Sequence, residues 1–226
     1  GYSVSLSSDG LTLAIGAYGN DGNGNYAGHV RIYTWNGTSW QQLGSDIDGE
    51  AVWNQSGISV SLSSDGLTVA IGAPGNSANG SWSGHVRLYS WNGSSWVQLG
   101  SDIDGEAAYD NSGTSVSLSS DGLTVAIGAW YNDGNGSNSG HVRLYSWNGT
   151  AWLKLGADIN GEAAGDASGY SVSLSSDGLI VAIGAFGNNE NGNYSGHVRL
   201  YTWNGTAWVQ LGLDIDGEAA GDQSGT

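Results

Sequence analysis

The chain has no cysteine, no methionine and a single proline among its 226 residues, and only five lysines and arginines. Without cysteine, it can form neither a disulfide nor a thiolate metal site. The five basic residues stand against 21 aspartates and glutamates, which gives a formal net charge of -16. Because like charges repel, this balance argues against nucleic acid as a partner. No apolar run approaches the roughly 18 residues of a membrane-spanning helix, so we expect no membrane insertion.

The dominant feature that is present is an internal repeat. The stretch SVSLSSDGLT-x-AIGA opens at Ser3 and returns at Ser59, Ser115 and Ser171, each time after 56 residues, with isoleucine in place of threonine in the last copy. A fixed period of this length is typical of repeat architectures, in which each unit packs against its neighbours. We therefore predict one continuous segment of four units, at residues 1–56, 57–112, 113–168 and 169–226.

Each unit predicts four short strands and no helix. In the first unit, residues 2–7, 11–17, 28–35 and 38–43 read as strands, and the 40 glycines of the chain fall mainly in the turns between them. Asn36-Gly37 is a strong hairpin signal, and a two-residue turn there would place Tyr33 opposite Trp40. The predicted fold is all-β: a β-propeller of four tandem 56-residue blades, each of four antiparallel strands.

Two tryptophans recur in every unit, in the third and fourth predicted strands. Because both are present in every copy, we predict that they are structural and mostly buried in the outer half of each blade. They are Trp35, Trp40, Trp91, Trp96, Trp147, Trp152, Trp203 and Trp208.

The second unit carries a family resemblance. SGISVSLSSDGLTVAIGAP, at residues 56–74, followed by Gly-His-Val-Arg-Leu-Tyr at 84–89, resembles the FG-GAP repeat. This is the blade unit of integrin α-subunit propellers and of many bacterial surface proteins. The match covers strands one to three of every unit, although only this unit has the proline of Gly-Ala-Pro. The resemblance implies an adhesion or ligand-binding propeller, extracellular or at the cell surface, usually with more than four blades.

One departure concerns calcium. The family often carries an Asp-x-Asp-x-Asp-Gly calcium loop between strands one and two, whereas the corresponding turn here holds one carboxylate, Asp9. Calcium takes about 6 to 8 oxygen ligands, so we predict no metal and no cofactor there. Asp46, Asp48 and Glu50 could begin a cation site, but a role in capping loop backbone and pairing with the repeated arginine is favoured. Calcium stays possible without being favoured.

A histidine and an arginine also recur in every unit, as His29 and Arg31 in the first. No nucleophile accompanies them, and an active site is normally one place rather than four. We predict that they lie between blades and satisfy hydrogen bonds, and that the chain is not an enzyme.

The candidate ligand-binding residues are aromatic side chains at positions where the repeats differ. They lie in the loops after strands two and four, which a four-stranded meander brings to one face, together with every acidic residue except the four turn aspartates. Aromatic rings with nearby amides and carboxylates suit either sugar rings or a protein surface. The candidates are Tyr18, Tyr26, Trp53, Trp82, Tyr109, Trp130, Tyr131, Phe186 and Tyr194.

The sequence thus predicts a non-enzymatic extracellular ligand-binding or adhesion propeller, whose ligand is a protein or a glycan. Two alternatives remain open: a carbohydrate-specific lectin, and a structural element that only spaces other domains. An open arc of four blades would expose apolar faces at its ends, which favours association. We expect a homodimer that closes an eight-bladed ring, or a part of a longer propeller, over a closed four-bladed monomer.

Overall fold

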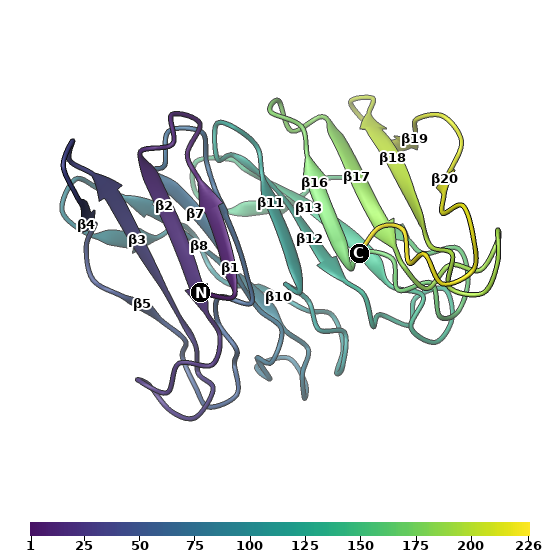
Figure 1. Cartoon of the computed structure of the whole chain (residues 1–226), viewed down its shortest axis with the longest axis horizontal. Coiled ribbons are helices and arrows are strands. Elements are labelled where there is room, and N and C mark those ends of the chain that lie inside the picture. Colours follow the sequence, from purple (N-terminus) through teal and green to yellow (C-terminus); the bar gives the residue numbers. More distant parts are fainter.

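The computed structural model describes all 226 residues. They form four antiparallel sheets that follow one another along the chain, which we call blades 1 to 4 (Figure 1). This confirms the predicted all-β fold of four tandem blades. No helix occurs, so none is available to cross a membrane.

The strands have the same bounds in each blade, shifted by the repeat. Blade 1 contains β1 (Ser3–Leu6), β2 (Thr12–Ala17), β3 (His29–Trp35), β4 (Trp40–Gln42) and β5 (Ile47–Asp48). Blade 2 contains β6 (Ser59–Leu62), β7 (Thr68–Ala73), β8 (His85–Trp91), β9 (Trp96–Gln98) and β10 (Ile103–Asp104). Blade 3 contains β11 (Ser115–Leu118), β12 (Thr124–Ala129), β13 (His141–Trp147), β14 (Trp152–Lys154) and β15 (Ile159–Asn160). Blade 4 contains β16 (Ser171–Leu174), β17 (Ile180–Ala185), β18 (His197–Trp203), β19 (Trp208–Gln210) and β20 (Ile215–Asp216).

The turn between β1 and β2 is closed by its single carboxylate. Asp9 Oδ1 accepts hydrogen bonds from the Ser7 hydroxyl at 2.6 Å and from the Leu11 N–H at 2.9 Å. These bonds, the one from Ser7 first, hold the pKa of Asp9 below its usual value. The carboxylate is therefore engaged in its own turn, as an Asx-type turn requires.

The fourth predicted strand, at residues 38–43, is shortened to β4, and a fifth short strand that was not predicted, β5, follows it. β4 pairs with the C-terminal half of β3, whereas β5 pairs with the N-terminal end of β3, at His29 and Val30. The prediction of Tyr33 opposite Trp40 is wrong, because Trp40 pairs with Trp35. The hairpin turn has four residues rather than two, since Asn36 Oδ1 accepts from the backbone N–H groups of both residues 38 and 39, at 3.0 Å each.

Alternation along the strands gives every blade two apolar faces. We call the face with Val4, Leu6 and Ile15 the leading face, and the face with Val30 and Ile32 the trailing face. In each of three cores, the trailing face of one blade packs against the leading face of the next. The first core contains Ala14, Val30, Ile32 and Ile47 from blade 1, and Val60, Leu62, Val69, Ile71 and Tyr89 from blade 2. The cores therefore lie at the joints between blades, so one blade alone would have none.

The repeated tryptophans lie at the outer edge of these joints. The six in blades 2 to 4 are partly buried, whereas the two in blade 1 are exposed, so the prediction of burial is wrong for blade 1. Trp96 is half-buried against the first core, and its indole Nε1 donates to the carbonyl of Leu43 in blade 1 at 2.8 Å. In blade 1, whose leading face no blade of this chain covers, Trp35 and Trp40 are 37% and 42% exposed. An indole at the outer edge of a joint can keep part of its ring in water while its N–H donates to a carbonyl of the neighbouring blade.

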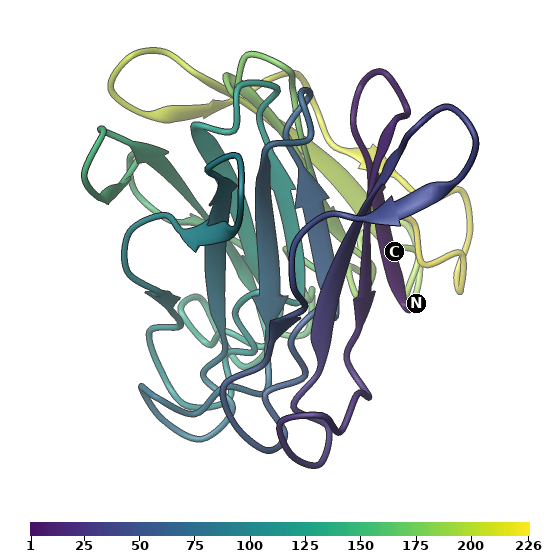
Figure 2. The same ribbon diagram turned by 90° about the vertical axis from the view of Figure 1, so that its left-hand side faces the viewer.

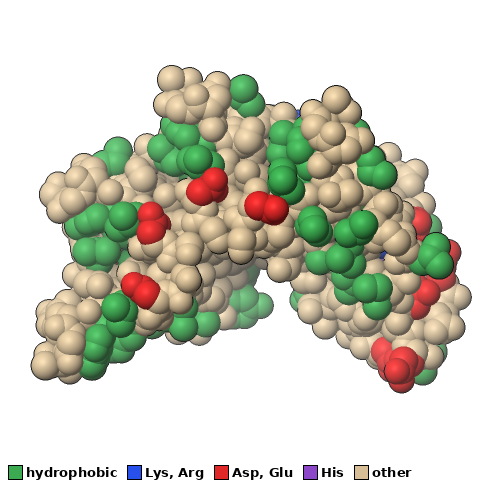
Figure 3. Space-filling model, turned by 90° about the horizontal axis from the view of Figure 1, so that it is seen from above, with side chains coloured by type: hydrophobic (Ala, Val, Ile, Leu, Met, Phe, Trp, Pro, Cys, Tyr) green, Lys and Arg blue, Asp and Glu red, His purple; other side chains and the backbone are tan.

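The four blades form an arc that does not close. Seen from above, a gap separates its two ends (Figure 3). The N-terminus lies in blade 1 and the C-terminus in blade 4, on the same side of the molecule (Figures 1 and 2). The closed four-bladed ring, the least favoured alternative, is not the structure of the single chain.

Candidate functional site

The long loops after β2 and β5 meet at one end of each blade and are tied to each other by main-chain bonds. In blade 1, the N–H of Trp53 donates to the carbonyl of Asn25 at 2.8 Å, and that of Gln55 donates to Tyr26 at 3.0 Å. The Asn23 amide donates to the carbonyl of Gly49 at 2.7 Å. The loops thus present their aromatic side chains from a fixed backbone, as a binding surface needs.

Several candidate aromatics adopt the left-handed backbone conformation that normally favours glycine. The φ angles are 66° at Trp53 and 69° at Tyr109, and the same position of the repeat is glycine at 165 and 221, with φ of 86° and 85°. Tyr26, Trp82 and Tyr194 have φ between 51° and 55°. Such a conformation costs a bulky residue about 1–3 kcal/mol. Backbone strain of this kind clusters at functional sites, so it favours these aromatic residues as parts of a binding site.

Trp53 and Trp82, from different blades, line one cleft at the first joint. The cleft has a volume of about 450 Å³ and is completed by Val52, Gly75 and Ser77. The Trp53 ring also stacks on Tyr26, with centroids 4.8 Å apart and an interplanar angle of 11°. Trp53 is 46% exposed, so its free side is available to a ligand.

A second cleft occupies the equivalent place at the joint between blades 2 and 3. Tyr109 and Tyr131 line it with Ala108, Asn111, Asp133 and Asn138, and its volume is about 310 Å³. Tyr109 is 64% exposed. The two clefts share their position in the fold and differ in chemistry, since only the second adds a carboxylate and two amides to its aromatic walls.

The remaining candidates do not line these clefts. Trp130 packs on Tyr131 and on Phe186 in the corresponding loop of blade 4, and Tyr18 packs on Tyr26 within its own loop. Tyr194 is 48% exposed and lines neither cleft.

Sequence reasoning missed two aromatics, Tyr2 and Tyr170, which contact Tyr18 and Phe186 respectively. The signal was present, because the second position of the repeat also varies, from tyrosine to isoleucine and threonine.

Buried histidines next to carboxylates recur at the joints. In the joint between blades 1 and 2, His85 Nδ1 lies 3.5 Å from Asp102 and 4.0 Å from Glu50, which comes from the preceding blade. Arg87 lies 3.5 Å from the other oxygen of Glu50 and donates to the carbonyl of Asp48 at 2.7 Å. The arginine therefore satisfies hydrogen bonds between blades, as predicted, while both ring nitrogens of His85 are buried without a hydrogen-bond partner, contrary to prediction.

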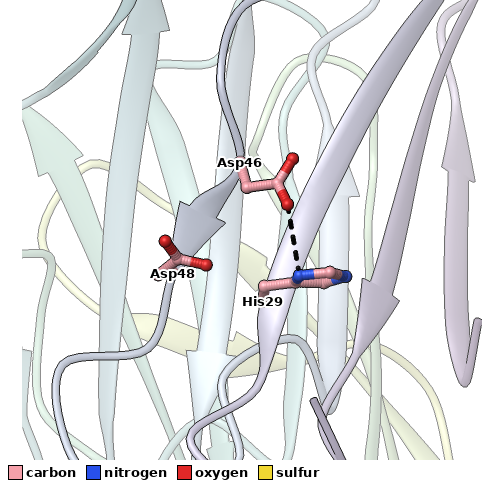
Figure 4. Close-up of side chains that lie close together, drawn as sticks. All are labelled: His29, Asp46 and Asp48. Carbon is pink, nitrogen blue, oxygen red and sulfur yellow. Dashed lines mark ion pairs between the residues drawn. The ribbon is translucent and has the colours of Figure 1, made fainter. Parts of the chain in front are cut away.

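The same three kinds of side chain recur at the next two joints, as Glu106, His141 and Asp158 and as Glu162, His197 and Asp214. In each group, possible ligand atoms lie within 4.8 Å of one another, a donor set that could take a cation. The neighbouring arginine already supplies a positive charge to the glutamate at these joints. Blade 1 differs, because His29 and Asp46 face each other across 3.5 Å with Asp48 beside them and no glutamate from a preceding blade (Figure 4).

Acidification is expected to destabilise the fold through the buried histidines. Burial, and then the charge of Arg87, lower the pKa of His85 to about 4. Burial, and then the charge of Arg143, likewise lower the pKa of His141. A depressed pKa favours the neutral form in the folded state. The stability that neutral His85 contributes to the fold is therefore complete above the ordinary pKa of 6.5. It is lost as the pH falls through about 4.

The urea midpoint should accordingly fall between pH 6.5 and 4, and a His85→Asn variant should fall less steeply over the same window. Protonation of the many carboxylates affects both proteins alike, so the difference between the two curves isolates the histidine. Parallel curves would contradict the assignment.

A second set of pockets lies along the outer rim of the joints. The pocket in the joint between blades 2 and 3 has a volume of about 310 Å³ and is lined by Asp102, Tyr145 and Trp152 among others. The other two joints have pockets of about 300 and 250 Å³ at equivalent positions. Because their lining residues are nearly the same each time, these pockets reflect joint geometry, whereas the loop clefts vary.

Comparison with known proteins agrees with this architecture. Residues 103–145 match the FG-GAP repeat, a region that runs from β10 through most of β13. No curated protein matches the chain.

Among solved structures, similar chains include a candidate 6-phosphogluconolactonase from Bacteroides uniformis, with a TM-score of 0.63 and 11% identity over 95% of this chain and 54% of that one. Another is the hydrazine synthase of Kuenenia stuttgartiensis, with a TM-score of 0.60 and 13% identity over 95% of this chain and 48% of that one. A third is a candidate 6-phosphogluconolactonase from Bacteroides fragilis, with a TM-score of 0.63 and 11% identity over 96% of this chain and 55% of that one.

At these identities the likeness concerns the fold alone, and the chain spans about half the length of the solved chains it matches. The FG-GAP match covers one stretch of the chain. The sequence repeat and the sheet to which that stretch belongs occur four times along the chain. The match to the FG-GAP repeat and the four repeated sheets are consistent with a β-propeller of the FG-GAP type.

Proposed function

We propose that this chain is a non-enzymatic, extracellular binding or adhesion module that takes its ligand on the face formed by the loops after β2 and β5 and their counterparts. The observation that carries the proposal is the cleft between Trp53 and Trp82, which lie on successive blades. Both residues hold their rings in a strained left-handed conformation. A scaffold that only spaced other domains would not need this strain at Trp53, where its third and fourth repeats have Gly165 and Gly221.

Carbohydrate is the ligand class favoured among the alternatives. The first cleft offers two indole faces on which the C–H face of a sugar ring can stack. The second cleft adds Asp133, Asn111 and Asn138, whose amide and carboxylate groups can bind sugar hydroxyls. Differing chemistry at two equivalent clefts suits two different sugar residues of one glycan.

The burial of the histidines supports a binding role over a catalytic role that would use them as acid or base. The histidines that lie close to carboxylates are buried at the joints, with His85 and His197 0% exposed, so a substrate could not reach them. The solved relatives named as lactonase and synthase share the fold at 11–13% identity, and their activities are not carried over.

The test uses residues that the repeat already accepts. Trp53→Gly and Trp82→Asn copy the third repeat, which has Gly165 and Asn138 at these positions. On a glycan array, and with intact cells as a second probe, the double variant should bind at least about tenfold more weakly than the wild type, as expected for aromatic hot spots. Its urea midpoint should change little, because relief of backbone strain offsets the lost stacking.

Tyr194→Asn is the matched control, since it makes the same kind of change at the same repeat position in blade 4, where no cleft is lined. Unchanged binding by the double variant would refute the proposed surface. Binding to cells but to no glycan would keep the surface and assign it a protein ligand, and turnover of a bound glycan would refute the non-enzymatic role.

A further inference from the structure

The leading face of blade 1 is uncovered. Val4 and Leu6 on β1 are 67% and 58% exposed, whereas their counterparts in blade 2, Val60 and Leu62, are 9% and 7% exposed. The difference arises because no other blade of this chain packs against the leading face of blade 1. An apolar strand face left in water in this way is typical of an interaction surface.

The trailing face of blade 4 is uncovered in the same way. Ile215 on β20 is 57% exposed, whereas Ile47, Ile103 and Ile159 at the same repeat position are 5–6% exposed. Leu211, whose counterpart Leu43 packs against the first core, is 46% exposed. Each end of the arc is therefore one half of the joint that the chain already forms three times.

The polar groups at the two ends are complementary as well. At every joint, the N–H of a leading-face leucine donates to a serine hydroxyl of the preceding blade, as Leu62 does to Ser5 at 2.9 Å. Applied to the ends of the arc, this pattern pairs Leu6 with Ser173. At every joint an indole N–H also donates to a leucine carbonyl, as Trp96 does to Leu43. The corresponding groups at the two ends are Trp40 and Leu211.

The cluster of glutamate, histidine and aspartate is also divided between the ends. Three joints unite a glutamate of one blade with a histidine and an aspartate of the next. The fourth set is split, because His29 and Asp46 lie at the N-terminal end and Glu218 follows β20 at the other (Figure 4). Arg31 is half-exposed and pairs only with Asp46, whereas its three counterparts each pair with a glutamate of the preceding blade.

We propose that a second copy of this chain covers both ends. The leading face of blade 1 in each copy docks on the trailing face of blade 4 in the other, so that two arcs close into an eight-bladed ring with two-fold symmetry. A second copy is the partner that fits, because each end of the arc is complementary to the opposite end of the same chain. Seen from above, the two ends of the arc are held apart, so neither end covers the other (Figure 3).

Light scattering on the intact chain gives the first test. The expected mass is about 46 kDa, twice the 23.2 kDa of one chain. Leu6→Asp should reduce the mass to that of one chain without changing the circular dichroism, because Leu6 is already 58% exposed in a single chain. The matched control is Val97→Asp, at a 46% exposed site on the outer strand β9, which should keep the doubled mass. A single-chain mass for the wild type over a wide range of concentration would overturn the proposal.

A cysteine pair gives the second test, in a chain that has no cysteine of its own. Leu6→Cys combined with Ser173→Cys places one thiol at each end of the arc, so oxidation should yield a covalent pair of chains on a non-reducing gel. Each single variant, oxidised alone, should give far less of this product. Cross-linking within one chain would mean that four blades close on themselves, and a ladder of larger products would mean an open filament. Either result would overturn the two-fold ring.

Discussion

Gly72→Ala is expected to destabilise the chain by at least about 3 kcal/mol, because a methyl group at this position has no space. Gly72 lies on β7, where an added Cβ would overlap the carbonyl oxygen of Gly113 and the hydroxyl of Ser59. Gly113 cannot easily withdraw, since its N–H donates to the carbonyl of Gly128 at 3.0 Å. The collision is therefore between two fixed stretches of backbone, which tolerate overpacking least. Urea denaturation followed by tryptophan fluorescence measures the loss.

The control for this variant is Gly93→Ala, in the β8–β9 hairpin. Its φ is 96° and no atom lies within 4 Å of the added Cβ, so only the backbone conformation is penalised, by about 1 kcal/mol. A Gly72→Ala midpoint no lower than that of the control would contradict the steric explanation.

Leu88→Ala is expected to cost about 2–5 kcal/mol, the range for truncating a fully buried leucine. Leu88 is 1% exposed on the trailing face of blade 2 and belongs to the core shared with Val116, Leu118 and Ile127 of blade 3. Two blades line the cavity that the substitution would leave, so relaxation of one blade cannot fill it. The urea midpoint gives the change, and Leu153→Ala, at a 52% exposed site, should shift it by less than about 1 kcal/mol.

The repeat supplies a sharper control at Leu200, which holds the same position in blade 4. In the Leu6→Asp background, where the arc ends are kept apart, Leu200→Ala should cost clearly less than Leu88→Ala, because nothing packs over the trailing face of blade 4. Equal losses in that background would mean that the cores belong to single blades rather than to joints.

The periodic sequence determined the class of fold, the strands and their faces. Val4 and Leu6 alternate with serines, and Leu13 and Ile15 alternate with smaller residues, so the two sides of each strand were readable from residue size and polarity. These features depend on neighbours two residues apart, and four copies of the pattern agree. The varying aromatic positions were readable for the same reason, since they stand out against an otherwise constant repeat.

The tertiary structure decided what depends on how segments meet. Asn36 closes a turn of four residues because its side chain accepts two backbone N–H groups, and Trp35 rather than Tyr33 therefore faces Trp40. Trp53 and Trp82 share a cleft only because loops of successive blades converge, and their left-handed backbone follows from that loop geometry. The open arc depends on the angle between successive blades, a property of whole packed faces that no single stretch of sequence encodes.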